Sequence, residues 1–127
     1  MKMLKKDLIA LIIIMMFVIG INYITDKIMK DAVFEIRYIA KEIEEELEEK
    51  INVNKIKELD EKWNNKEKML SYFSEHDELE KVTKEVKSLI ISADNESKEE
   101  IKEEIEQINF LLSHIEEKNK LKLKNIF

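Results

Sequence analysis

The chain has 127 residues, of which 44% are hydrophobic and 39% are charged, and its net charge is -6. It has one glycine and no proline, which predicts an all-helical protein because these residues mark turns. It has no cysteine, which excludes disulfides and thiol chemistry. The acidic balance disfavours nucleic acid as a partner.

The first predicted element is an apolar run, LIALIIIMMFVIGI, that covers Leu8 to Ile21 without a polar residue. Extended to Ile24, it reaches about 17 residues, which is the short end of what spans a bilayer. Lysines before the run can snorkel to one surface, and Tyr23 suits the other. The run therefore predicts a transmembrane helix over residues 8–24.

Three lysines precede this run, and they are Lys2, Lys5 and Lys6. Because positively charged flanks stay on the inner side of a membrane, residues 1–7 are expected in the cytoplasm. Residues 25–127 then form an extracytoplasmic domain, and the protein is expected to be a single-pass protein of the cell membrane.

Two other interpretations of the apolar run remain open. A run of this length also suits the hydrophobic region of a cleaved signal peptide, with Val18 to Gly20 as a poor substitute for an Ala-x-Ala site. A buried core helix is the second, although flanking lysines fit a membrane better. Sequencing the N-terminus of the mature protein distinguishes an uncleaved anchor, which we expect, from a cleaved peptide that leaves a chain beginning near Ile21.

Four series of apolar residues follow at helical spacing, as for helices that pack on one another. The first steps by three or four residues, so one helix can leave the bilayer and continue to about residue 50. The series are Ile28, Ala32, Ile36, Ile39, Ile43, Leu47 and Ile51; then Ile56, Leu59, Trp63, Leu70 and Phe73; then Leu79, Val82, Val86, Leu89 and Ala93; and finally Ile101, Ile105, Ile108, Leu112 and Ile115.

Short polar breaks separate the series at residues 52–54, 74–78 and 92–100. Each offers side chains that cap helices, and the spacing of Ser97 and Glu100 is that of a capping box. The other candidate caps are Asn52, Asn54, Ser74, Asp77, Asp94 and Asn95. Short connections make neighbouring helices antiparallel. We therefore expect an all-α fold in which the transmembrane helix continues into an antiparallel up-down bundle of about four helices.

Residues 118–127, KNKLKLKNIF, are expected to form an extended C-terminal tail near the outer membrane surface. The apolar residues could cap the open end of the bundle, or the tail could rest on lipid with its lysines near anionic headgroups. Candidate contact residues for the membrane or a partner are Lys118, Lys120, Leu121, Lys122, Leu123, Lys124, Ile126 and Phe127.

No pattern in the sequence predicts an active site, a cofactor site or a metal site. His76 and His114 are the only imidazoles, and neither has a glutamate three residues before it, as di-iron bundles require. The glutamate-rich run from Glu42 to Glu49 fits a solvated helix face. Trp63 falls on an apolar series, so core packing is the first interpretation and a partner contact is the second. We expect a protein that is not an enzyme.

The segment from Ile108 to Phe127, INFLLSHIEEKNKLKLKNIF, resembles the end of a family of short bacterial proteins known only as domain of unknown function four-three-six-three. Trp63 in a lysine-rich second helix adds to the likeness, whereas Glu116 stands where the family often has proline. The resemblance implies a membrane-attached helical protein on the surface of clostridial-type Gram-positive bacteria. It implies no activity, substrate or cofactor. The residues that carry it are Leu111, Leu112, Ser113, His114, Ile115, Leu121, Leu123, Asn125 and Ile126.

The expected function is that of an interaction or structural module, as an accessory to another membrane protein or a self-assembling surface protein, with Trp63 and the tail as contacts. The alternative is a sensor domain for a small ligand or ion, working with a separate signalling partner. A third class is a cell-division or lysis-type coiled coil made of one long helix, against which the polar breaks argue. No small-molecule substrate is inferred.

Overall fold

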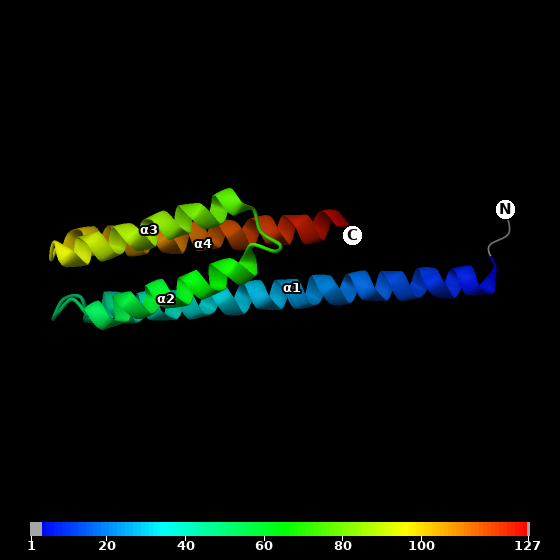
Figure 1. Ribbon diagram of the computed structural model, residues 1–127, viewed down its shortest axis with the longest axis horizontal. Coiled ribbons are helices and arrows are strands. Elements are labelled where there is room, and N and C mark those ends of the chain that lie inside the picture. The colour runs from blue at the N-terminus through cyan, green and yellow to red at the C-terminus, as the bar shows by residue number, and fades with distance from the viewer. Residues whose placement is uncertain (1–3, 127) are drawn as a thin grey trace.

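The computed structural model describes the backbone of residues 4–126 and the side chains of residues 4–121, and over this part of the chain it contains four α-helices and no strand (Figure 1). These helices are α1 (Lys5–Glu46), α2 (Val53–Leu70), α3 (His76–Asp94) and α4 (Lys98–Ile126). The all-α prediction is confirmed, and the chain folds back on itself instead of forming one long helix.

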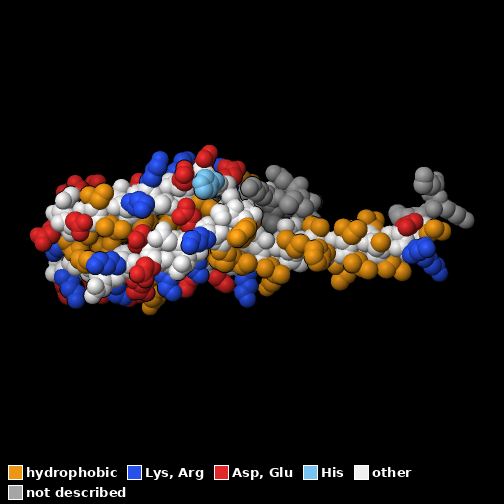
Figure 2. Space-filling view, viewed as in Figure 1, with side chains coloured by type: hydrophobic (Ala, Val, Ile, Leu, Met, Phe, Trp, Pro, Cys, Tyr) orange, Lys and Arg blue, Asp and Glu red, His pale blue; other side chains and the backbone are white. Residues whose placement is uncertain are grey.

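Helix α1 has 42 residues, and only its second half belongs to the bundle. Its first half extends beyond the other helices and is covered with apolar side chains (Figures 1 and 2). This is the one helix of the described chain that is long and apolar enough to cross a membrane, and none of its apolar segment is buried. The helix continues without a break from this segment into the bundle.

The four helices form an up-down bundle in which each contacts its two neighbours in a closed ring. Helix α1 packs on α2 and α4, and α3 packs on the same two helices. Within the described residues, the diagonal pairs α1–α3 and α2–α4 make no comparable contact. The predicted antiparallel arrangement is therefore confirmed.

The core is formed by one apolar stripe from each helix, and it contains nearly all the predicted residues. On α1 the stripe is wider than the sequence series, because Met29, Val33 and Ala40 are also buried. The reason is that α1 packs on two helices, and one residue per turn covers only one of these contacts. On α4, Leu111 is buried for the same reason.

Side chains of the polar breaks end and begin the helices. Asn52 Oδ1 accepts a hydrogen bond from the backbone N–H of Lys55 at 3.1 Å, and Asn52 Nδ2 donates to Glu46 Oε2 at 2.9 Å. The second bond holds the end of α1 against the start of α2, so α1 ends at Glu46 instead of near residue 50. Helix α3 is preceded by Glu75, which makes no side-chain cap, so the predicted caps Ser74 and Asp77 are wrong.

The turn between α3 and α4 contains the predicted capping residue. The Ser97 hydroxyl accepts from the backbone N–H of Glu100 at 3.4 Å, which confirms Ser97 as the cap. The second bond of a capping box is replaced, because Glu100 Oε2 accepts from the Ser92 hydroxyl at 3.3 Å. Glu96 has a φ of 54°, in the left-handed region that glycine adopts most easily. The turn is held by a bond from the Ser97 N–H to the Ser92 carbonyl at 3.0 Å.

The backbone of residues 118–126 continues α4 as a helix. The prediction of an extended tail over these residues is therefore wrong. Lysine and leucine both favour helix, and the stretch contains no glycine or proline to stop it. The alternation of apolar and lysine residues gave a misleading impression of an extended segment. As a result, α4 runs past the α2–α3 turn and alongside α1 (Figure 1).

Candidate functional site

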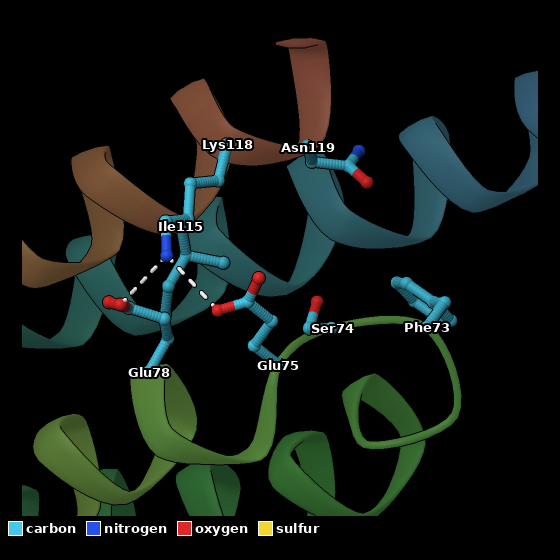
Figure 3. A pocket seen from close by; sticks show the side chains of 7 residues that line it. All are labelled: Phe73, Ser74, Glu75, Glu78, Ile115, Lys118 and Asn119. Carbon is cyan, nitrogen blue, oxygen red and sulfur yellow. Dashed lines mark hydrogen bonds and ion pairs between the residues drawn. The ribbon is translucent and has the colours of Figure 1, made fainter. Parts of the chain in front are cut away.

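Charged side chains from α3, α4 and the α2–α3 turn meet where this turn passes beside α4, and we call them the Glu78 cluster. Figure 3 shows three of them, Glu75, Glu78 and Lys118. Lys118 Nζ donates to Glu75 Oε2 and to Glu78 Oε1, both at 3.1 Å. Lys81 Nζ lies 3.7 Å from Glu78 Oε1, and His114 Nε2 lies 3.7 Å from Glu78 Oε2. The cluster ties the beginning of α3 to α4.

Glu78 is the buried member of this cluster, with 9% of its side chain exposed. Its hydrogen bond from Lys118 lowers the pKa of its carboxyl group, while burial acts in the opposite direction. The same contacts raise the pKa of Lys118, with its bonds to Glu75 and Glu78 as the main causes. Both shifts favour the charged forms, so the pair remains ionised at neutral pH.

The lowered pKa of Glu78 predicts a loss of stability in acid. A carboxylate whose pKa is lowered on folding stabilises the native state above its ordinary pKa of 4.5, and this contribution disappears as the pH falls through the lower folded value. Glu78→Gln should therefore be less stable than the wild type at pH 7, and the two should converge below pH 4.5. Denaturant unfolding of the full chain in detergent, across this pH range, measures the difference. Glu80→Gln, at an exposed position, should show no such convergence.

The cluster borders a recess lined by side chains from three segments (Figure 3). Its volume is about 20 Å³, which is room for one water molecule. Asn119 is buried beside it, and its Nδ2 has no hydrogen-bond partner in the protein. The residues that line the recess are Phe73, Ser74, Glu75, Glu78, Ile115, Lys118 and Asn119.

The two histidines lie apart and have different surroundings. His76 begins α3, where its Nε2 is 3.6 Å from Glu80 Oε1 at an exposed position. His114 on α4 belongs to the Glu78 cluster and is half-buried. In the described part of the chain, no three histidine, cysteine, aspartate or glutamate side chains gather as a metal site would need.

Trp63, a candidate partner contact, lies in the bundle core with 1% of its surface exposed. Its Nε1 donates to Thr83 Oγ1 on α3 at 2.8 Å, so its one polar atom is satisfied inside the protein. The interpretation of Trp63 as a partner contact is therefore corrected, because no partner can reach the indole while the bundle is folded.

The residues of the tail are only partly described. Lys118 belongs to the Glu78 cluster, whereas Lys120 and Leu121 are exposed on α4. The side chains of the remaining candidates lie outside the described residues, and these are Lys122, Leu123, Lys124, Ile126 and Phe127.

An exposed aromatic pair on α1 was missed by the sequence analysis. Phe34 and Tyr38 stack with ring centroids 6.3 Å apart, and they remain 69% and 57% exposed. They occupy the side of α1 that faces away from the core, bordered by Glu35 and Glu42 of α1 and by Lys62 of α2. Phe34 and Tyr38 are four residues apart, and each is two residues from the core position Ile36. This spacing places both rings on the face of the helix opposite Ile36, and it could have revealed the pair in the sequence.

Arg37 fixes the face of α1 that carries this pair. Its guanidinium donates to the Ser113 hydroxyl and to the Asn109 carbonyl, and lies 3.5 Å from Glu116 Oε1, all on α4. Because α4 holds one side of α1 and α2 holds another, the Phe34–Tyr38 pair cannot rotate into the core without breaking these bonds.

Comparison with protein families finds a match over residues 18–126 to a family described as a domain of unknown function, DUF4363. The match covers the second part of the apolar segment of α1 and the whole bundle. Comparisons with curated proteins and with solved structures find no match.

Proposed function

The chain belongs to the DUF4363 family, and we propose that it is a non-enzymatic, membrane-anchored interaction module that serves as an accessory to another membrane protein. The apolar half of α1 spans the cell membrane, with residues 1–7 in the cytoplasm and the bundle outside. The lysines before the span support this orientation. The unbroken passage of α1 from its apolar half into the folded bundle supports an anchor that is retained.

The observation that carries this proposal is the stacked pair Phe34–Tyr38. Charged side chains of both signs are scattered over the outer surface of the bundle, as Figure 2 shows for one face. Two adjacent aromatic rings left in water on such a surface are typical of contact sites, because aromatic side chains dominate the energy of protein interfaces. A shared stack also holds both rings in place before a partner arrives.

The position of the pair indicates what kind of partner it fits. Phe34 and Tyr38 are on the same helix as the span, a few turns beyond Ile24. A partner anchored beside α1 in the same membrane meets this face without either protein leaving the bilayer. A membrane protein with an apolar or aromatic patch near its outer surface is therefore the proposed occupant.

Site-specific photocrosslinking tests this proposal in intact cells. Benzoylphenylalanine in place of Phe34 should give one dominant crosslinked membrane protein, which mass spectrometry identifies. The matched control places the same group at Phe110, an equally exposed aromatic residue on α4, and should give no such product.

Two outcomes would count against this function. Adducts of the chain with itself alone would indicate a self-assembling surface protein instead of an accessory subunit. Equal or absent crosslinking at the two positions would show that the aromatic pair has no privileged partner, and the proposal would be abandoned.

A sensor for small ligands is the alternative function, and it receives less support. A ligand pocket commonly encloses about 300–1,000 Å³. The recess beside Glu78 offers about 20 Å³, and its charged groups Lys118, Glu75 and Glu78 already bond to one another. The larger hollows of the described surface, such as the one of about 490 Å³ lined by Lys41, Glu44, Glu45 and Glu48, are shallow and open to solvent. An ion would meet Lys118 at the centre of the cluster, which opposes binding of a cation.

A further inference from the structure

The end of α4 reaches farther toward the membrane span than any other part of the bundle. The α2–α3 turn lies beside the middle of α1, and α4 continues past that turn along α1 (Figure 1). The structure thus places one helix end, and not a loop, next to the point where α1 leaves its apolar segment.

The bonds of Arg37 give the register of this contact. The Arg37 guanidinium contacts Asn109, Ser113 and Glu116 of α4, so Arg37 is about level with Ser113, the middle one of the three. The helices are antiparallel and rise at the same rate, so thirteen residues further along α4 correspond to thirteen residues back along α1. The backbone of Ile126 is therefore about level with Ile24, where the apolar run ends.

The sequence at this helix end has the charge that an anionic surface attracts. Four lysines occur between residues 118 and 124. Lys118 is already paired with Glu75 and Glu78, so the lipid contact rests on Lys120, Lys122 and Lys124. Within the described side chains, Leu121 is 59% exposed among them. A basic stretch with exposed apolar residues is typical of segments that lie in the headgroup region.

The remainder of the extracytoplasmic bundle has the opposite charge. The end of the bundle distant from the span is rich in glutamate, including Glu48 and Glu96 in its turns and Glu99 at the start of α4. An anionic lipid surface repels these turns and attracts the end of α4. The anchor also keeps the end of α4 next to lipid at all times, whereas a second copy or a partner protein must first diffuse to it.

We propose that the end of α4, over residues 118–126, lies on anionic lipid headgroups beside the exit of α1 from the bilayer. The helix end then acts as a second membrane contact that fixes the tilt of the bundle relative to the span. This inference rests on the proposed anchoring by α1.

Fluorescence quenching in proteoliposomes tests the contact. The chain has no cysteine, so Leu121→Cys gives a single site for an environment-sensitive fluorophore in the full-length protein. In vesicles that contain phosphatidylglycerol, lipids with a nitroxide on the headgroup should quench this probe, and aqueous iodide should reach it poorly. The matched control is Ile91→Cys, which is 60% exposed on α3 near the turn farthest from the span, and it should show the reverse.

A charge variant separates lipid contact from simple proximity. Replacing Lys120, Lys122 and Lys124 with glutamine should reduce headgroup quenching at position 121. The corresponding change of Lys84, Lys87 and Lys102, exposed on the bundle, should leave quenching unchanged. Vesicles of phosphatidylcholine alone should also reduce the quenching of the wild-type probe.

The outcomes distinguish this inference from the proposed anchor. Suppose that the protein floats with the vesicles and that iodide quenches the probes at positions 121 and 91 equally. This result overturns the lipid contact and leaves the anchor intact. Shielding from iodide without headgroup quenching indicates coverage by protein, and also overturns it. Protein that fails to float with the vesicles refutes the anchor itself.

Discussion

Replacing Trp63 with alanine lowers the free energy of unfolding of the bundle by about 3–5 kcal/mol. The indole is almost completely buried between α2 and its neighbours, and its loss removes both core contacts and the hydrogen bond to Thr83. A domain of this size commonly has about 5–15 kcal/mol of stability, so much of the total is removed. Denaturant unfolding of the full chain in detergent micelles, followed by circular dichroism, measures the change.

A surface substitution provides the comparison for this result. Tyr72→Ala removes another large aromatic side chain, but Tyr72 is exposed in the α2–α3 turn and should change stability by less than about 0.5 kcal/mol. Trp63→Phe keeps part of the core contact and should lie between the two. If Trp63→Ala proves as stable as Tyr72→Ala, the described packing of the core is wrong.

Two charges in the apolar half of α1 are expected to abolish membrane insertion. Ile13→Arg combined with Phe17→Arg places arginine near the centre of the proposed span, where each costs about 2.5–3.5 kcal/mol of insertion free energy. Carbonate extraction of cell membranes measures the fraction that remains embedded. The wild type should stay in the membrane at its full-length mass, and the double variant should not.

The control for this experiment uses the same chemistry on the bundle surface. Ile91→Arg with Phe110→Arg also replaces two exposed apolar residues, and this variant should remain in the membrane. A wild-type protein whose mass lacks the first 20 or so residues would indicate a cleaved signal peptide. Full retention of the Ile13 and Phe17 double variant would exclude this segment as the anchor.

Much of the fold could be predicted because helical spacing reports burial directly. The series on α3 and α4 alternated three and four residues, and every one of these positions is buried. The capping role of Ser97 was also predictable, because it depends on residues only three positions apart. Local patterns of this kind need no knowledge of which helices are neighbours.

The candidate sites could not be predicted in the same way, because they depend on registers between distant segments. Glu78 and Lys118 are 40 residues apart, and nothing local indicates that they meet. Trp63 shows a related limit, since its spacing suits both a core residue and a contact residue, and only the packing of α3 decides between them. The helical end of α4 was missed because alternating lysine and leucine residues resemble a strand pattern, although both favour helix.

The unbroken α1 also limits how small a partner can be. Phe34 is ten residues beyond Ile24, so at the rise of an α-helix it stands about 15 Å beyond the end of the proposed span. Membrane proteins with only tight outer turns do not extend that far and could not touch the aromatic pair. Under the proposed function, the protein therefore selects partners whose outer parts project by about three helical turns. Inserting or deleting one turn of α1 between residues 24 and 34 would change that reach while the bundle itself stays folded.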